Sequence, residues 1–283
     1  MKNMKKILCL TLALLMVLAL CACGSKAQAN TLTVAISPDF APMEFVDTTK
    51  SGQDQYVGFD VTLAKYIAAE LGKELVIKPM SFDACQAAVQ SGNVDCSISG
   101  FSYTDSRAEN FNLSDYYYAG DNETKQTIIV LKEKEGQFSK AEDFAGLTVG
   151  AQAASLQEEM CNTQLPAEAT IELYTDIGTA VEALRNGKID ALAVAEGNGN
   201  AIIANNDAIA MSGFYFDVSA EAENNLILIK KGNDQLTADI NACLAKAYAA
   251  GNYGPWYEEA KALAGIDTSA EISYTDAGEV DAG

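Results

Sequence analysis

The sequence predicts an α/β fold of two lobes, and three features of the 283-residue chain support this prediction. Short apolar runs alternate with helical segments of about ten residues, the pattern of β-α-β units. The segment "AVQSGNVDCS" at 88–97 is echoed by "ALRNGKIDAL" at 183–192, and each has a helix end, a Gly turn and an apolar-Asp pair that opens a strand. The chain is 49% hydrophobic, enough to bury the cores of two modest domains.

The first half of the chain contains two predicted strand–helix–strand units. We expect strands at 31–36, 74–80 and 94–99, and helices at 61–72 and 82–92. Both helices stop at a glycine, Gly72 and Gly92, which is a common C-terminal signal. The turn "SPDFAPMEF" follows the first strand. This alternation implies parallel strands joined by right-handed crossovers.

The second half repeats the alternation and then ends in helices. Its predicted strands lie at 124–132, 147–152, 169–174, 189–195 and 224–233. The predicted helices lie at 155–165, 176–187, 198–205, 236–251 and 255–265. The acidic segment 266–283 is predicted to be a flexible tail.

The N-terminus carries the pattern of an export signal. Three lysines precede an apolar stretch from Ile7 to about Ala22, which is short for a bilayer span of about 20 residues. The stretch ends in "LCACGS", which resembles a bacterial lipobox, and the small Ala22 makes Cys23 the expected lipid acceptor. We therefore predict a lipoprotein signal peptide at 1–22 and a linker at 23–30 that starts with the lipidated cysteine. An ordinary signal peptide with a chance cysteine is the alternative.

Composition excludes several classes of function. With 39 acidic residues against 19 basic ones, the net charge of −20 disfavours nucleic-acid binding, which needs clustered Lys and Arg. The chain has no histidine and its cysteines form no C-x-x-C pair, so zinc sites and Ser-His or Cys-His catalysis are not expected. No cofactor is predicted. Four cysteines remain after residue 23, and we expect small buried core residues, with a Cys85–Cys96 bridge as the less favoured alternative.

Six sequence blocks in order resemble the bacterial extracellular solute-binding proteins, family 3, which serve ATP-driven importers of polar amino acids. The blocks are "SPDFAPMEF", "YVGFDVTLAKYIAAELG", "SFDACQAAVQSGNVDCSISGFSYTDSRAENFNLSDYYY", "VGAQAASLQEE", "LRNGKIDAL" and "LAKAYAAGNYGPWYEE". The resemblance implies a type II periplasmic-binding-protein fold, with two α/β lobes joined by a two-strand hinge. Lobe 1 would comprise 31–120 and 219–265, and lobe 2 would comprise 125–215. The hinge strands would lie near 122–126 and 217–220, and the ligand between the lobes.

The resemblance implies a carboxylate-binding group in lobe 1. Arg107 occupies the position of the family's carboxylate-binding arginine, and a guanidinium can donate two parallel hydrogen bonds to a carboxylate. Ser99, Gly100 and Ser102 precede it on the loop that leaves the strand, and Gly100 allows a close approach of the backbone. The alternatives are a solvated arginine at a helix start and serines that only form the turn.

The remaining walls of the expected site come from aromatic residues and from lobe 2. Phe40 and Phe82 match the aromatic residues that enclose the ligand side chain, and core packing is the alternative for each. Ser155 and Leu156 match the start of the lobe 2 helix, whose N–H groups would complete the carboxylate site. Gln152 could reach the ligand side chain. For Ser155 the alternative is a simple N-cap role.

The end of the strand at 189–195 departs from the family. Most amino-acid binders have an aspartate there that pairs with the ligand ammonium, whereas this chain has Ala195 followed by Glu196. Three explanations are open: Glu196 takes the role, the alignment slips by one residue, or the ligand lacks a standard α-ammonium group. We predict Glu196, with Ser37 and Asp39 as helpers, because a buried ammonium without a carboxylate is costly.

The resemblance implies the substrate-binding component of an ABC importer. It would capture an amino acid or a close analogue in the cleft between the lobes and deliver it to a membrane permease. The protein would be an exported monomer, anchored by its lipid to the outer face of the cell membrane, and not an enzyme. The alternatives are a dehydratase on the same fold, with Glu196 transferring protons, and a sensory ligand-binding domain.

Overall fold

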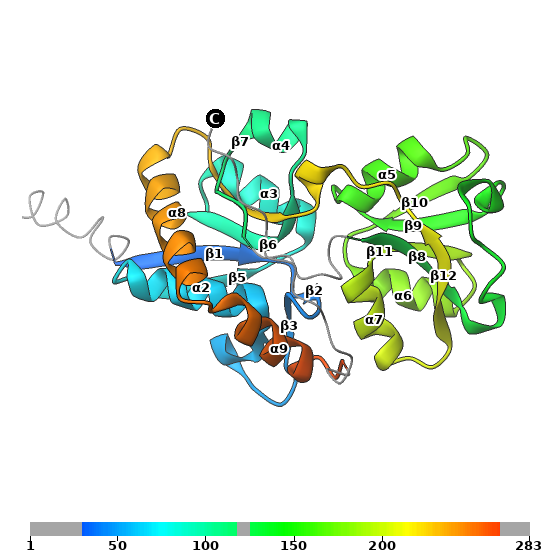
Figure 1. The fold of residues 1–283 in the computed structure, drawn as a ribbon, viewed down its shortest axis with the longest axis horizontal. Coiled ribbons are helices and arrows are strands. Elements are labelled where there is room, and N and C mark those ends of the chain that lie inside the picture. Colours follow the sequence, from blue (N-terminus) through cyan, green and yellow to red (C-terminus); the bar gives the residue numbers. More distant parts are fainter. Residues whose placement is uncertain (1–29, 118–124, 267–283) are drawn as a thin grey trace, which may run out of the picture.

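The computed structural model describes residues 30–117 and 125–266. The predicted signal peptide, Cys23, most of the linker and nearly all of the predicted tail lie outside these residues. Within the described ranges, no helix is both long enough and apolar enough to span a membrane. The elements form two lobes that lie side by side, each built around one five-stranded sheet (Figure 1).

Lobe 1 is built around a sheet with the strand order β5-β1-β6-β13-β7. Strand β1 is parallel to both of its neighbours, whereas β13 is antiparallel to β6 and β7. The strands are β5 (Glu74–Pro79), β1 (Thr31–Ile36), β6 (Cys96–Ser102), β13 (Asn225–Lys230) and β7 (Phe111–Leu113). The helices are α2 (Phe59–Glu70), α3 (Phe82–Ser91), α4 (Asp105–Asn110), α8 (Asp234–Ala249) and α9 (Tyr253–Leu263). A small antiparallel sheet of β2 (Asp39–Phe40), β3 (Glu44–Val46) and β4 (Tyr56–Val57) follows β1.

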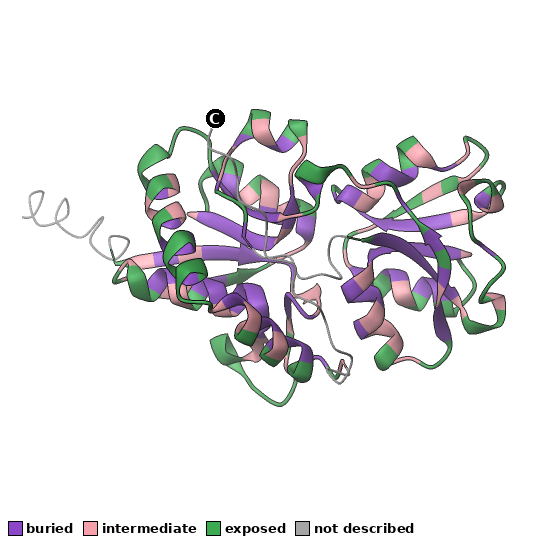
Figure 2. Ribbon diagram, in the orientation of Figure 1, coloured by how far each residue is buried: buried purple, intermediate pink, exposed green. Residues whose placement is uncertain are grey.

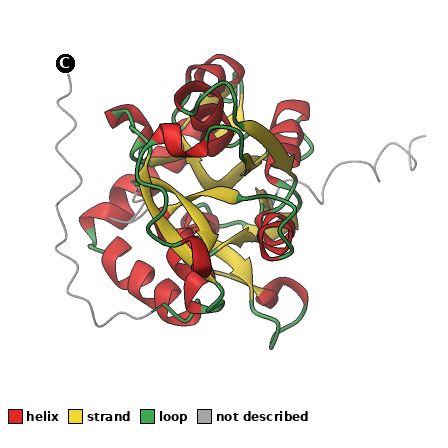
Figure 3. Ribbon diagram, turned by 90° about the vertical axis from the view of Figure 1, so that its right-hand side faces the viewer, coloured by secondary structure: helices red, strands yellow, loops and turns green. Residues whose placement is uncertain are grey.

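Lobe 2 has a sheet with the strand order β10-β9-β11-β8-β12, and helices lie on both sides of the strands (Figure 3). Strand β9 is parallel to β10 and β11, and β8 is antiparallel to β11 and β12. The strands are β8 (Gln126–Leu131), β9 (Thr148–Gln152), β10 (Thr170–Tyr174), β11 (Ala191–Ala195) and β12 (Ile209–Tyr215). The helices are α5 (Leu156–Gln164), α6 (Ile177–Arg185) and α7 (Glu196–Ala204). Short 3-10 turns occur at Gly52–Gln55, Lys132–Lys134, Ala141–Phe144 and Ala220–Ala222.

Each sheet is covered on both faces, and its central strands are buried along their length (Figure 2). In β1, Val34 and Ile36 pack into the core beside α2, whereas Ala35 packs into the core on the α3 side. In β11, Ala193 faces one core and Val194 the opposite one. This alternation follows the two-residue period of a strand. Burial on both faces explains why these strands are apolar almost throughout.

The echoed segments form equivalent structures in the two lobes. Gly92 and Gly187 end their helices with φ of +76° and +64°, a conformation that favours glycine. Three residues after each glycine, an aspartate accepts a backbone N–H from the first half of a neighbouring strand. Asp95 Oδ2 accepts the Thr33 N–H at 2.7 Å, and Asp190 Oδ2 accepts the Thr148 N–H at 3.1 Å. The repeated sequence therefore encodes the same helix-to-strand joint in each lobe: a glycine that ends the helix and an aspartate that binds a neighbouring strand.

Most predicted elements are present, and the differences have local causes. The structure adds β12, whose residues "IAMSGFY" lack clear alternation, and α4, β7 and the small sheet, which are too short to show a period. The predicted turn "SPDFAPMEF" contains β2 and part of β3. The four described cysteines, Cys85, Cys96, Cys161 and Cys243, are free and buried, which confirms their predicted place in the core. Cys85 and Cys96 do not form the alternative bridge.

Two connections join the lobes. One is the segment 114–125, of which 118–124 lie outside the described residues, and the other is the segment 216–224 between β12 and β13. The predicted hinge at 217–220 lies in the second connection, and the predicted hinge near 122–126 starts in the first.

Candidate ligand-binding site between the lobes

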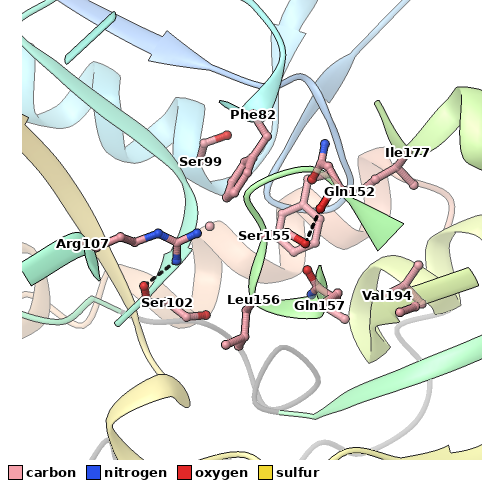
Figure 4. Close-up of a pocket in the computed structure, with 14 residues that line it drawn as sticks. Phe82, Ser99, Ser102, Arg107, Gln152, Ser155, Leu156, Gln157, Ile177 and Val194 are labelled. Carbon is pink, nitrogen blue, oxygen red and sulfur yellow. Dashed lines mark hydrogen bonds between the residues drawn. The ribbon is translucent and has the colours of Figure 1, made fainter. Parts of the chain in front are cut away.

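A cavity lies between the lobes and is lined by residues of both (Figure 4). Nine of the ten predicted ligand-binding residues line it: Phe40, Phe82, Ser99, Gly100, Ser102, Arg107, Gln152, Ser155 and Leu156. The lining also includes five residues that the sequence analysis did not select: Gln157, Ile177, Ala193, Val194 and Ala195. Among all fourteen, Arg107 is the single charged residue.

Arg107 is positioned by the start of α4 and is only 4% exposed. Thr104 caps this short helix by accepting the Arg107 N–H at 3.2 Å. The guanidinium donates to two carbonyl oxygens, Nη1 to Ser102 at 2.6 Å and Nη2 to Ala154 of lobe 2 at 3.0 Å. Burial lowers the pKa of Arg107 to about 10, so the side chain remains charged at neutral pH. Within the part of the chain described, no carboxylate forms an ion pair with it.

Two phenylalanine rings hold the guanidinium in place from one side. The Arg107 Cζ lies 5.6 Å from the centroid of the Phe82 ring and 5.2 Å from that of Phe101. The two rings stack on each other with centroids 4.7 Å apart. Phe82 therefore belongs both to the core and to the cavity wall. The two predictions for this residue, ligand contact and core packing, do not exclude each other. A cation held against aromatic faces loses little freedom when it binds an anion.

The N-terminus of α5 faces the cavity from lobe 2. Ser155 caps the helix: its hydroxyl accepts the Glu158 N–H at 3.1 Å and donates to the Gln152 carbonyl at 2.7 Å. The N-cap alternative for Ser155 is therefore present, and its hydroxyl is already used. Leu156 and Gln157 supply the first backbone N–H groups of the helix, where the helix dipole favours negative charge.

Gly100 and Phe40 form a close contact on the lobe 1 wall. Gly100 has a φ of +58°, and a Cβ atom built on it would lie 2.6 Å from the Phe40 ring. The ring therefore lies directly against the backbone at the end of β6, which continues to Ser102, so Ser99, Gly100 and Ser102 belong to the strand and not to the predicted loop. Glycine is required here for two reasons, the left-handed backbone and the lack of space.

Two buried acids, Asp60 and Glu44, hold the end of β6 through hydrogen bonds. Asp60 Oδ2 accepts the Gly100 N–H at 2.8 Å and the Tyr117 hydroxyl at 3.0 Å. The Ser99 hydroxyl donates to Glu44 Oε1 and accepts the Ser37 N–H at 2.9 Å. Ser99 thus lines the cavity, but its hydroxyl is bound within lobe 1.

Burial changes the protonation of these two acids. Burial, followed by the charge of Asp60, raises the pKa of Glu44 well above its ordinary value, and burial raises the pKa of Asp60 to about 6. The two carboxyl groups influence each other's ionisation. Within the described residues, Glu44 Oε2 and Asp60 Oδ1 have no hydrogen-bond partner. Glu44 and Asp60 were not predicted from the sequence, although an Asp or Glu inside an apolar segment is a signal for a buried, paired carboxyl group.

Asp39 joins the lobes rather than facing the cavity. Its Oδ2 accepts the Ile177 N–H at the start of α6 at 2.7 Å and the Gln152 Nε2 at 3.1 Å. Its Oδ1 accepts the Ser37 hydroxyl at 2.8 Å. Asn198 adds a second bridge by donating to the Ala41 carbonyl at 3.0 Å. The two predicted helpers, Ser37 and Asp39, are thus engaged with each other and with lobe 2.

Glu196 is the predicted site residue that does not line the cavity. It begins α7, and its carboxylate points to the neighbouring strands: Oε1 accepts the Tyr215 hydroxyl at 2.5 Å, and Oε2 lies 3.6 Å from Lys125 Nζ. Ala195, the residue before it, occupies the wall instead and is 1% exposed. The strand ends at Ala195, and the turn into α7 directs the next side chain away from the ligand.

The sequence profile of the bacterial extracellular solute-binding proteins, family 3, matches residues 32–260. The chain belongs to this family. Members act outside the cytoplasm as solute-binding proteins, so the family implies export of this chain. The assignment from six ordered sequence blocks is confirmed.

Individual members are similar over most of their length. The arginine-binding extracellular protein ArtP of Bacillus subtilis is 30% identical over 83% of this chain and 88% of its own. A probable histidine-binding protein of Campylobacter jejuni is 28% identical over 74% of this chain and 80% of its own. Among solved structures, an amino acid ABC transporter substrate-binding protein, AbpA, of Streptococcus pneumoniae bound to L-arginine superposes with a TM-score of 0.76. It is 33% identical and covers 84% of this chain and 97% of its own. The predicted type II fold is thus confirmed.

Proposed function

We propose that the cavity binds a solute by its carboxylate, between Arg107 of lobe 1 and the N-terminus of α5 in lobe 2. The observation that supports this most strongly is the buried guanidinium, which lines the cavity and has only carbonyl oxygens as hydrogen-bond partners. A buried charge without a counter-charge is costly. A carboxylate would supply that charge, and the free N–H groups of Leu156 and Gln157 would bind its second oxygen.

The family and the relatives agree on the class of function. The chain is the substrate-binding component of an ABC importer, and it captures an amino acid or a close analogue for a membrane permease. The relatives described above are named for arginine and histidine, and the aligned solved structure contains L-arginine. The solute of this chain is an α-substituted carboxylate of comparable size.

Hinged closure completes the proposed binding cycle. The rigid units are 31–120 with 219–265, and 125–215, and they move about the two connections near 122–126 and 217–220. Closure brings the α5 N-terminus to Arg107 and the α6 N-terminus to Asp39. The bonds that Asp39 and Asn198 form across the lobes stabilise the closed arrangement.

Several further properties are part of the proposal. Cys23 carries a lipid that holds the exported protein at the outer face of the membrane, beside its permease, and the protein acts there as a monomer. It requires no cofactor and catalyses no reaction. The acidic surface, with a net charge of −20, keeps copies apart by repulsion.

The test is calorimetry on Arg107 variants, with a solute chosen by a thermal-shift panel of amino acids and their carboxylate analogues. Because Arg107→Ala leaves the bound carboxylate unpaired, we expect a loss of affinity of several kcal/mol, about 100-fold or more. Arg107→Lys keeps the charge but not the two parallel donors, so an intermediate affinity is expected. Arg185→Ala is the matched control, since Arg185 is exposed and paired with Glu182. Unchanged binding by Arg107→Ala would rule out the carboxylate clamp.

A further inference from the structure

Among the residues that the structure describes, the cavity lining carries a single charge, that of Arg107, which does not balance the charges of an ordinary amino acid. An amino acid brings a carboxylate and an ammonium group, and Arg107 can neutralise only the first. At the end of β11, where a carboxylate could face the ammonium, the cavity is lined by Ala195, which carries no charged group. Enclosing an ammonium without a counter-charge would leave a net positive charge away from water, which is strongly unfavourable.

Nearby carboxylates do not fill this role, because each is already engaged elsewhere. Glu196 is bound by Tyr215 and lies beside Lys125, outside the cavity. Asp39 accepts three hydrogen bonds, from Ser37, Gln152 and Ile177. None of the acids in the described residues lines the cavity.

Two further acids lie beneath the lobe 1 wall and are equally unsuited. Burial raises the pKa of Glu44, which accepts the Ser99 hydroxyl, and Asp60 accepts the Gly100 N–H and the Tyr117 hydroxyl. The two acids are completely buried and do not line the cavity, whereas Ser99 and Gly100 of β6 do. Recruiting either acid for an ammonium would break the bonds that position the end of β6.

The wall opposite Arg107 is suited to an uncharged group. The end of β11, at Ala193, Val194 and Ala195, and Ile177 of α6 line it, and all four residues are apolar. Phe40 and Leu156 add apolar surface elsewhere in the cavity. The polar side chains at this end are neutral amides: Gln152, and Gln157, whose Nε2 donates to Gln126 Oε1 at 2.5 Å. Such a surface can accommodate a hydroxyl, an oxo group or an amide together with an apolar side chain. An aromatic face attracts a cation by only about 0.5–2 kcal/mol, too little to replace a buried counter-charge.

We infer that the preferred solute carries its carboxylate as the sole charge: an amino-acid analogue whose α-carbon bears a hydroxyl, an oxo group or an acylated nitrogen. This inference rests on the proposed carboxylate clamp, since Arg107 must face the carboxylate for the α-substituent to face Ala195. The bound pair of Arg107 and carboxylate is then neutral overall. The same site would reject cationic amino acids, which add a second positive group.

Calorimetry with matched ligands tests this inference. For the leucine, methionine and phenylalanine skeletons, the probes are the L-amino acid, its 2-hydroxy acid, its 2-oxo acid and its N-acetyl derivative. We expect at least one uncharged α-substituent to bind about tenfold or more tightly than the parent amino acid. Parent amino acids that bind as tightly or more tightly would overturn the inference and leave the clamp intact. No binding by any probe would overturn both.

A substitution at Ala195 provides the reverse test. Ala195→Asp places a carboxylate beside the α-substituent, so the order should invert, with the parent amino acid gaining about tenfold and the analogue losing affinity. Ala195→Asn has the same shape without the charge and should not favour the amino acid. Circular dichroism and thermal unfolding show whether each variant folds. An Ala195→Asp protein that folds and still binds the analogue more tightly than the amino acid would contradict the proposed location of the α-substituent.

Discussion

The two lobes share a plan but bury different kinds of polar group. In the described part of the chain, every buried charged side chain belongs to lobe 1: Glu44, Asp60, Arg107 and Lys261. The buried polar side chains of lobe 2 are neutral: Gln126, Thr127, Gln152, Ser155, Asn198 and Ser212. Charges are expensive to bury and need fixed partners, whereas neutral groups lose less when they leave water. Lobe 1 therefore carries a fixed framework of buried ionisable groups, and lobe 2 completes the site with neutral groups.

The largest expected effect comes from a methyl group added to the lobe 1 framework. Gly100→Ala introduces a Cβ atom 2.6 Å from the Phe40 ring, at a φ of +58°. The strain of the left-handed backbone and the overpacking should together cost about 2–4 kcal/mol of unfolding free energy. Because the end of β6 leads to Arg107, affinity should also fall about tenfold or more. Urea unfolding and calorimetry measure the two losses.

The matched substitution in lobe 2 is Gly187→Ala. Gly187 has a similar φ of +64°, but no atom lies within 4 Å of a Cβ built there. It should cost only the backbone strain, about 1–2 kcal/mol, and leave affinity unchanged. Equal effects of the two substitutions on ligand affinity would contradict the special role of the end of β6.

The second prediction concerns the pH dependence that the buried acids give to lobe 1. Burial raises the pKa of Asp60 to about 6, so the folded state binds a proton more tightly than the unfolded state does. Its ionisation therefore destabilises the fold as the pH rises from about 4 to above 6, by about 2–3 kcal/mol. Asp60→Asn cannot ionise, so the wild type should lose stability relative to this variant between pH 4.5 and pH 7.5. Urea unfolding at the two pH values measures the change.

Asp190 of lobe 2 is the control with the opposite sign. Hydrogen bonds from Thr148 and Lys134 outweigh its desolvation and lower its pKa. Its contribution to stability is present above the pKa of the unfolded chain and is lost as the pH falls through the folded pKa. The advantage of the wild type over Asp190→Asn should thus decrease toward acid pH. Parallel pH profiles for the two variants would refute the assignment of opposite shifts.

The smallest effect on stability is expected for the helix-to-strand joint that occurs once in each lobe, with Asp95 in lobe 1 and Asp190 in lobe 2. Asp95→Ala removes two acceptor bonds, to the Thr33 N–H at 2.7 Å and the Thr33 hydroxyl at 2.6 Å, and should cost about 1–3 kcal/mol. Asp190→Ala removes one longer backbone bond at 3.1 Å and a partly exposed ion pair, so about 1 kcal/mol is expected. Thermal unfolding compares the two. A greater loss of stability for Asp190→Ala than for Asp95→Ala would contradict this order.

The sequence predicted the regular elements well because their burial imposes a period. Strand β1 was expected at its observed bounds, and α2 and α6 were displaced by one or two residues. Strand β12 was missed because Ser212 and Gly213 interrupt its apolar residues, and partner strands rather than local propensity define it. The short α4 and β7 have too few residues to show a period at all.

Residues that line the cavity were predicted correctly where their position in the sequence fixes the course of the backbone. The prediction was less successful where the direction of a side chain decides whether it lines the cavity. Gly100 lies near the end of β6 and Arg107 shortly after it, so their place in the cavity could be inferred from the order of the blocks. Ile177 lines the cavity only because α6 of lobe 2 approaches Asp39 of lobe 1, a contact between distant segments without a local signal. Glu196 lies one residue beyond the wall, and a shift of one residue at a strand end reverses the face to which a side chain points.

The bonds that cross between the lobes also set the conditions for unloading. Asp39 supplies an acceptor for the first N–H of α6, so this helix has its terminal donor satisfied only while the lobes are together. Separating the lobes returns that N–H, the Gln152 amide and the Asn198 amide to water. In the proposed binding cycle, a permease that opens the protein would have to overcome these contacts as well as the affinity for the solute. The residence time of the cargo is therefore adjustable at Asp39 and Asn198, without any change to the residues that select the cargo.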